Sequence, residues 1–240
     1  MQLRVYHKVD QPLVLPLGYH HIVQSVLFRT LEAVPEYSGF LHDRGYEGKT
    51  RTFKLFTFGL LQGAYQIQGK NIVFTEDVSF EIRSIDPYML KLLKEGFEKK
   101  GITYLGQTYR EVSATLNNEE VDETELTIRM VSPVCVYSTD RESGKTVYYH
   151  PEEEAFYKRI SESFRRKYEA YTGVAAESDI SMELKKLHPK DKYITKYKGF
   201  TICAWKGTYV LRGKRQYLDF LYQTGLGSKN AQGFGMFEVV

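Results

Sequence analysis

Hydrophobic and polar residues alternate at the start of the chain and then change to a helical period. The stretch Leu3–Val9 alternates residue by residue, which predicts a strand. From about Tyr19 the apolar residues recur at helical spacing, which predicts a helix that Pro35 ends; these residues are Ile22, Val23, Val26, Leu27 and Leu31.

Strands and one further helix complete the first half. Strand patterns cover Phe53–Leu61 and Ile72–Ile85, with turns between them. A helix opens at Pro87 and closes at Gly101, and a strand pattern returns over Ile102–Leu116. The order is therefore β-α-β-β-α-β with an extra hairpin in the middle, which is the order of a ferredoxin-like domain.

The second half repeats this order more loosely. Its predicted elements are, in sequence, a strand at Leu126–Tyr137, a helix at Glu152–Tyr171, a basic hairpin at Ser181–Arg212, a helix at Lys214–Thr224 and a strand at Met236–Val240. We therefore predict an α+β fold of tandem ferredoxin-like (RRM-like) βαββαβ halves, residues 1–117 and 124–240. The acidic segment Asn117–Glu125 is the predicted linker.

Composition narrows the class of protein. With 240 residues, of which 42% are hydrophobic, the chain can bury one large core or two small ones. No apolar run reaches the roughly 20 residues of a membrane span, and the first residues lack a signal peptide's apolar region. We expect a cytoplasmic protein that does not enter a membrane. Cys135 and Cys203 fit neither a metal site nor a disulfide framework, and we expect no metal and no cofactor.

Positive charge is concentrated in one block. The net charge is only +3, yet residues 185–215 contain ten Lys or Arg and a single acid, Asp191. Aromatic residues are interleaved with these cations, as on a face that binds a polyanion. The alternative is a solvated, lysine-rich hairpin without such a role. The lysines that we expect to contact phosphates are Lys185, Lys186, Lys190 and Lys192.

A glycine-rich stretch lies near the end of the sequence, between a predicted helix and a predicted strand. It runs from Gly225 to Gly235 and contains four glycines with Lys229 and Asn230 near its middle. A predicted helix precedes it and a strand follows, which excludes the Rossmann and P-loop order of strand, loop and helix. It is either a helix C-cap followed by a flexible turn or a loop that contacts a phosphate backbone through amides and one charge.

These pieces together resemble a known family. The segment Gly225–Met236, GLGSKNAQGFGM, is similar over its whole length to the glycine-rich signature of the CRISPR-associated endoribonucleases that mature guide RNA (family six of the Cas proteins, RAMP superfamily). The N-terminal pieces agree, namely Leu15-Pro16 before a helix with Gln24 and Ser25, then Phe40-Leu41-His42, and then Phe53–Thr57.

The resemblance implies metal-independent cleavage of CRISPR repeat RNA in the precursor transcript. The 2′-hydroxyl attacks the adjacent phosphate and leaves a 2′,3′-cyclic phosphate and a 5′-hydroxyl. The family often uses a Tyr on the first helix, a His on the next loop and a Lys at the next strand. His42 and Lys54 match the last two, whereas Phe28 stands at the Tyr position and cannot transfer a proton. A CRISPR effector complex and a homodimer are open as further partners.

Chemistry supports these two residues as the catalytic pair. Histidine titrates near pH 6.5, which suits proton transfer, and a lysine can stabilise the charged phosphorane. The alternatives are a surface histidine at His42 and an edge-strand lysine at Lys54. His20 or His21 could replace the missing Tyr, although a core or capping role is simpler. The predicted RNA-binding residues are Arg51, the four lysines above, Gly225, Gly227, Lys229, Asn230, Gly233 and Gly235.

Two other functions compete with an endoribonuclease. A non-catalytic RNA-binding subunit of the same superfamily would keep the fold and the glycine loop, and Phe28 favours it. A generic tandem RRM-like protein would carry base-stacking RNP motifs, and the sequence has no good copy of them.

Overall fold

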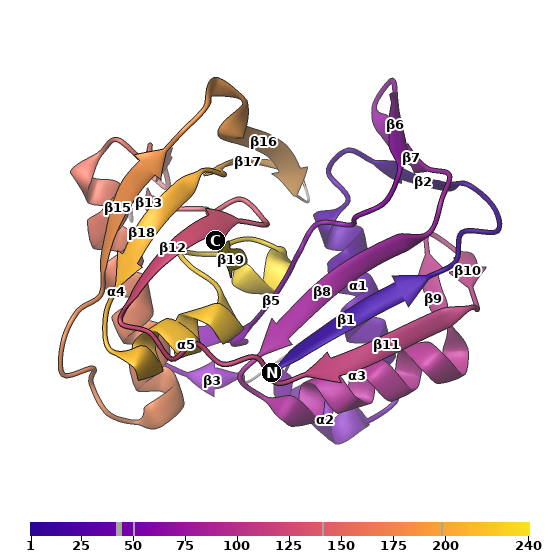
Figure 1. Ribbon diagram of the computed structural model, residues 1–240, viewed down its shortest axis with the longest axis horizontal. Helices are drawn as coiled ribbons and strands as arrows, with labels where there is room; N and C mark the ends of the chain where they lie inside the picture. Colours follow the sequence, from indigo (N-terminus) through magenta and orange to yellow (C-terminus); the bar gives the residue numbers. More distant parts are fainter. Residues whose placement is uncertain (42–44, 50, 141, 198) are drawn as a thin grey trace.

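The computed structural model describes residues 1–41, 45–49, 51–140, 142–197 and 199–240, and its two halves lie side by side (Figure 1). The first half contains a four-stranded antiparallel sheet in the order β11-β1-β8-β5. Along the chain its elements are β1 (Gln2–His7), α1 (His20–Leu31), β5 (Phe56–Phe58), β8 (Val78–Ser84), α3 (Pro87–Lys100) and β11 (Val112–Asn117). This is the ferredoxin-like order of strands and helices.

The second half has the same design. Its antiparallel sheet has the order β15-β18-β12-β19. Along the chain its elements are β12 (Glu125–Met130), α4 (Glu154–Thr172), β15 (Ser181–Lys186), β18 (Thr208–Arg212), α5 (Arg215–Thr224) and β19 (Phe237–Val239). The α+β fold with tandem ferredoxin-like halves is therefore confirmed.

Smaller elements decorate the two sheets. Among the described residues, a further three-stranded sheet has the order β2-β7-β6, and four two-stranded sheets join β3 with β4, β9 with β10, β13 with β14, and β16 with β17. The bounds of these elements are β2 (Leu13–Pro16), α2 (Pro35–Gly39), β3 (Tyr46–Glu47), β4 (Thr52–Phe53), β6 (Tyr65–Gln68), β7 (Asn71–Phe74), β9 (Ile102–Tyr104), β10 (Gln107–Tyr109), β13 (Tyr137–Thr139), β14 (Thr146–Tyr148), β16 (Lys192–Tyr197) and β17 (Phe200–Trp205), with 3₁₀ turns η2 (Pro189–Asp191) and η3 (Asn230–Gln232). In the part of the chain that the structure describes, no helix has the length and apolar character needed to cross a membrane.

Several predicted boundaries are wrong. The strand expected over Ile102–Leu116 begins as the β9–β10 hairpin, because Leu105 and Gly106 turn the chain with φ of 48° and 91°. The strand expected from Leu126 stops at Met130, before Pro133. Pro35 opens the short helix α2, while α1 already ends at Leu31.

The predicted basic hairpin is two separate structures. Its outer strands, β15 and β18, pair within the main sheet of the second half. Only β16 and β17 form a hairpin of their own. The end of β16 points toward the first half (Figure 1).

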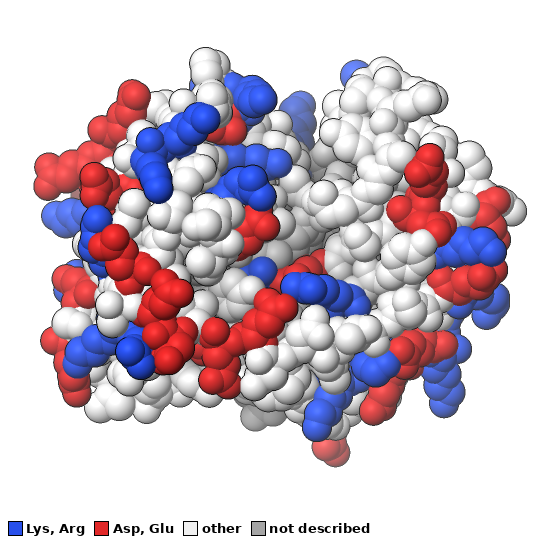
Figure 2. Space-filling view, in the orientation of Figure 1, with Lys and Arg blue, Asp and Glu red and all other residues white. Residues whose placement is uncertain are grey.

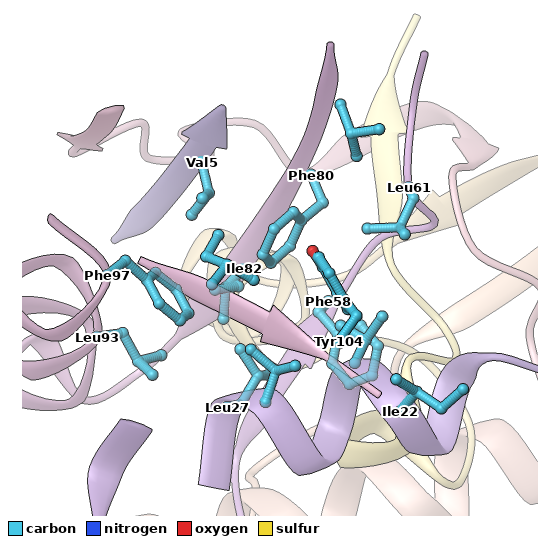
Figure 3. Packing of buried hydrophobic residues seen from close by; sticks show 14 of the residues in the cluster. Val5, Ile22, Leu27, Phe58, Leu61, Phe80, Ile82, Leu93, Phe97 and Tyr104 are labelled. Carbon is cyan, nitrogen blue, oxygen red and sulfur yellow. The ribbon is translucent and has the colours of Figure 1, made fainter. Parts of the chain in front are cut away.

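The first core lies between the sheet and its helices (Figure 3). The predicted apolar stripe of α1 is buried, and it packs with side chains of β1, β5, β8 and α3; labelled members are Val5, Ile22, Leu27, Phe58, Phe80, Ile82, Leu93 and Phe97. Burial of each such side chain contributes roughly 1.5–3 kcal/mol. At the start of α3 the Asp86 carboxylate accepts the Tyr88 amide at 2.9 Å, which caps the helix.

Direct contacts join the two halves. Arg83 on β8 is only 3% exposed, and its Nη1 donates to the Phe237 carbonyl on β19 at 2.6 Å. Its guanidinium lies 3.8 Å from the ring centroid of Tyr222 on α5. The Thr57 hydroxyl on β5 donates to the Phe234 carbonyl at 3.1 Å. The segment after α5 is therefore anchored on both halves.

Candidate active site

The glycine-rich loop, Gly225–Gly235, packs tightly against the rest of the protein. All four glycines are buried and have φ between 66° and 86°. A Cβ on Gly233 would lie 2.5 Å from the Phe58 ring, and one on Gly235 would lie 2.1 Å from the Leu226 carbonyl oxygen. Only glycine fits these conformations and these approaches. Their predicted contact with RNA stays a prediction.

Asn230 and Lys229 shape this loop from within. The Asn230 side-chain amide donates to the carbonyls of Leu226, at 2.8 Å, and Phe234, at 3.0 Å, so it ties the two ends of the loop together. Lys229 has a left-handed backbone, with φ of 62°, and its Nζ lies 4.9 Å from the centroid of the Tyr137 ring. The loop is therefore a built structure with one cation at its surface.

A pocket forms where this loop faces the segment Arg51–Phe56. It brings together five of the predicted site residues, which are Arg51, Lys54, Gly227, Lys229 and Asn230. The cations that line it are Arg51, Lys54, Lys167 and Lys229, and no Asp or Glu is among the described residues of its wall. Basic side chains without a described carboxylate in the same wall create a positive potential that favours an anion. We call this the cationic pocket.

Lys54 is held at one side of the cationic pocket. Its Nζ donates to the carbonyl of Leu41, the residue that precedes His42 in the chain. The same Nζ lies 5.2 Å from the centroid of the Phe28 ring, on the α1 face that the resemblance identifies as the Tyr position. His42 itself lies outside the described residues, so its predicted role stays a prediction.

Helix α1 forms another part of the wall. The Gln24 amide donates to the Ala231 carbonyl at 2.6 Å, and its Oε1 accepts from the Tyr197 hydroxyl. His20 is 2% exposed; its Nδ1 donates to the Gln232 carbonyl at 3.0 Å, and its Nε2 accepts from the Tyr193 hydroxyl at 3.2 Å. Burial lowers the pKa of His20 to about 4, so the ring is neutral near pH 7.

Comparison with known proteins identifies the family. Residues 116–239 match the family model described as CRISPR associated protein Cas6, C-terminal, which is more than half of the chain. The chain belongs to the Cas6 family. A CRISPR-associated endoribonuclease Cas6 of Methanocaldococcus jannaschii is 23% identical over 98% of this chain and 91% of its own length.

Two further relatives extend the likeness over the whole chain. An endoribonuclease-like Cas6 protein of Pyrococcus furiosus is 25% identical over 100% of this chain and 98% of its own length. The solved structure of a RAMP protein described as binding different RNA substrates superposes with a TM-score of 0.81 over 100% of this chain and 99% of that one, at 20% identity. The Cas6 fold therefore covers both halves.

The predicted lysines of the basic block do not join the cationic pocket. Lys186 and Lys190 line a groove between the two sheets. Lys192 lies with its Nζ 5.6 Å from the Trp205 ring centroid, and Lys185 donates to the Thr127 hydroxyl at 3.3 Å. Figure 2 shows this hollow between the halves, with acidic and basic side chains side by side in its lower part. Two of the four lysines therefore line the groove, and Lys185 and Lys192 line neither the groove nor the cationic pocket.

The members of the pocket that sequence reasoning missed include Gln24 and Lys167. Lys167 lies on α4 in line with the buried residues Phe156, Ile160 and Phe164. A lysine on the apolar stripe of an amphipathic helix is unusual, and this position was the available signal. Among the described residues, no group of three His, Cys, Asp or Glu could hold a metal ion.

Proposed function

We propose that this protein cleaves CRISPR repeat RNA in the precursor transcript, with the scissile phosphodiester in the cationic pocket. The observation that carries the proposal is the pocket itself: four cations and no described carboxylate, at the junction of the glycine loop, α1 and the segment that begins at Arg51. Relatives that match this chain over 91% and 85% of their own length are named Cas6 endoribonucleases. A phosphodiester is the anion that such an enzyme must hold.

The proposed reaction needs no metal. The 2′-hydroxyl loses its proton and attacks the neighbouring phosphorus, the P–O5′ bond breaks, and the 5′-oxygen takes up a proton. The products are a 2′,3′-cyclic phosphate and a 5′-hydroxyl. His42 transfers a proton in this scheme. Lys54 supplies a fixed positive charge to the phosphorane.

A non-catalytic RNA-binding subunit is the second candidate. Phe28 favours it, because a phenyl ring lies beside Lys54 where the family often has a proton-transferring hydroxyl. A relative that aligns over nearly its whole length is also named endoribonuclease-like. Such a subunit would bind repeat RNA in the same pocket and leave it intact.

Incubation of the purified protein with end-labelled repeat RNA in excess EDTA separates the two candidates. We expect a product that ends in a 2′,3′-cyclic phosphate. The matched control is the same RNA with 2′-deoxyribose at the scissile nucleotide, which should bind and stay intact. Cleavage of the deoxy RNA would exclude attack by the 2′-hydroxyl, and tight binding without any cleavage would favour the inert subunit.

A further inference from the structure

Lys167 is a buried lysine that the proposed reaction does not use. Its side chain leaves α4 and enters the cationic pocket, yet the residue is only 3% exposed. Its Nζ donates to the Gly225 carbonyl and, at 3.2 Å, to Asn230 Oδ1. One turn earlier on α4, the Ser163 hydroxyl donates to the Gly227 carbonyl at 2.8 Å. Helix α4 thus holds the first part of the glycine loop through two side chains.

The surroundings of this ammonium are unusually poor in negative charge. The charged groups that share its pocket are Arg51 and Lys54 from the segment before β5 and Lys229 from the loop; α1 contributes only the neutral Gln24. No described carboxylate lines the pocket. A buried ammonium without a carboxylate is costly. Burial, with Arg51 adding to it, lowers the pKa of Lys167 to about 7.

The hydrogen bonds match the neutral amine better than the ammonium. A neutral amine has two N–H groups, and Lys167 has two acceptors, on Gly225 and Asn230. An ammonium has a third N–H group. In the described part of the chain, no third acceptor lies within hydrogen-bond distance of Nζ. An anion in the pocket would supply both that acceptor and the missing negative charge.

We propose that Lys167 is the buried cation of a phosphodiester site: it fastens the glycine loop, and it takes up a proton when a phosphodiester group enters the cationic pocket. The proton comes from solvent: an N–H bond forms at Nζ as an O–H bond of hydronium breaks, and no bond of the phosphodiester changes. This inference rests on the proposed function only for the identity of the natural ligand. The shared chemistry is a singly charged phosphodiester, which dimethyl phosphate also provides.

The test is an NMR titration of the protein labelled with ¹³C-lysine. The ε-methylene signal of Lys167 is assigned by its loss in Lys167→Arg. In the free protein we expect its midpoint near pH 7. With dimethyl phosphate, or with repeat RNA carrying deoxyribose at the scissile nucleotide, the midpoint should rise by about one unit or more, which means about tenfold tighter binding to the protonated form. The ¹³C signal of Lys158, exposed on the same helix, should not move.

The outcomes separate this inference from the proposed function. A Lys167 midpoint that moves with dimethyl phosphate in a protein that never cuts RNA supports the inference and counts against the enzyme. A protein that cuts RNA while its Lys167 midpoint stays fixed with both ligands overturns the inference alone. A free-protein midpoint above about pH 9 also overturns it, because the amine would then be charged before any anion arrives. The wild-type titration needs no variant to fold.

Discussion

In the groove between the sheets, cations sit beside carboxylates of the same protein: Arg4 binds both Glu81, at 3.1 Å, and Glu119, at 2.9 Å, and Arg129 binds Glu238 at 2.7 Å. The cationic pocket has a comparable set of cations and no described carboxylate in its wall. The groove's positive charges are therefore partly neutralised by its own carboxylates, whereas the described wall of the pocket offers none. The number of Lys and Arg alone, six in the groove and four in the pocket, would have favoured the groove instead.

The largest expected effect tests the chemistry on the pocket side. His42→Ala should lower the single-turnover cleavage rate by roughly 10²–10⁴, the usual size of general acid–base catalysis. RNA affinity should change little, because neutral imidazole adds almost nothing to binding dominated by phosphates. His21→Ala is the matched control, since His21 Nδ1 already binds the Gly18 carbonyl at 2.9 Å. Equal rates for wild type and His42→Ala would remove His42 from the mechanism.

The stability of the folded protein should fall in acid because of His20, which joins α1 to the glycine loop and to the β16–β17 hairpin. His20 has a pKa of about 4 when folded and about 6.5 when unfolded, so the unfolded state binds more protons. Its contribution to stability is present above pH 6.5 and is lost as the pH falls toward 4, by about 3 kcal/mol in total. The measurement is the unfolding free energy in urea at both ends of this range.

His7 is also buried and has a lowered pKa, so it contributes to the acid sensitivity as well. The loss of unfolding free energy on acidification is therefore compared between wild type and His20→Gln. Wild type should lose more stability than the variant on acidification. Equal losses would mean that His20 titrates normally in the folded protein.

The glycine loop should be more sensitive to added side chains than an open turn. Gly233→Ala and Gly69→Ala both place a Cβ at positive φ, 86° and 62°. Only the former meets neighbours, the Phe58 ring at 2.5 Å and His20 Nδ1 at 3.0 Å, whereas nothing lies within 4 Å of the latter. Overpacking should make Gly233→Ala about 1–3 kcal/mol more destabilising in urea unfolding. Similar losses in both, with weaker RNA binding only in Gly233→Ala, would favour direct contact with RNA.

The smallest expected effect is on the salt dependence of RNA binding, which shows whether the pocket and the groove each contact RNA. Each lysine that neutralises a phosphate should lower the slope of log affinity against log salt by about 0.7 when changed to alanine. We expect this decrease for Lys229→Ala in the pocket and for Lys190→Ala in the groove. Lys91→Ala, exposed on α3, is the control. An unchanged slope for Lys190→Ala would mean that the RNA does not contact this lysine in the groove.

The fold could be predicted because its signals are local. The apolar spacing of α1 and α4 and the glycine after α3 are set by neighbours in the sequence, and these predictions held. The boundary error at Leu105 arose because the chain turns there with a positive φ, and a leucine gives no local sequence signal for such a turn.

The site could be predicted only in part, because its walls are far apart in the sequence. Lys54, Lys167 and Lys229 meet in one pocket although more than sixty residues of chain separate each from the next. Conversely, Lys186 and Lys192 are only six positions apart in the chain but belong to β15 and β16, which lie in different sheets. Their proximity in the sequence therefore suggested one basic surface, whereas the pairing of their strands places them in two different sheets.

The anchoring of the glycine loop on α1 and β5 also orders events during synthesis. The Gln24 amide and the Thr57 hydroxyl bind carbonyls that are 207 and 177 residues further along the chain. When α1 and β5 leave the ribosome, those partners have not yet been made. The first half can form its sheet and core early, but the cationic pocket closes only when residues 226–235 emerge. A nascent chain that stops short of them can have a folded first half but lacks this part of the pocket wall.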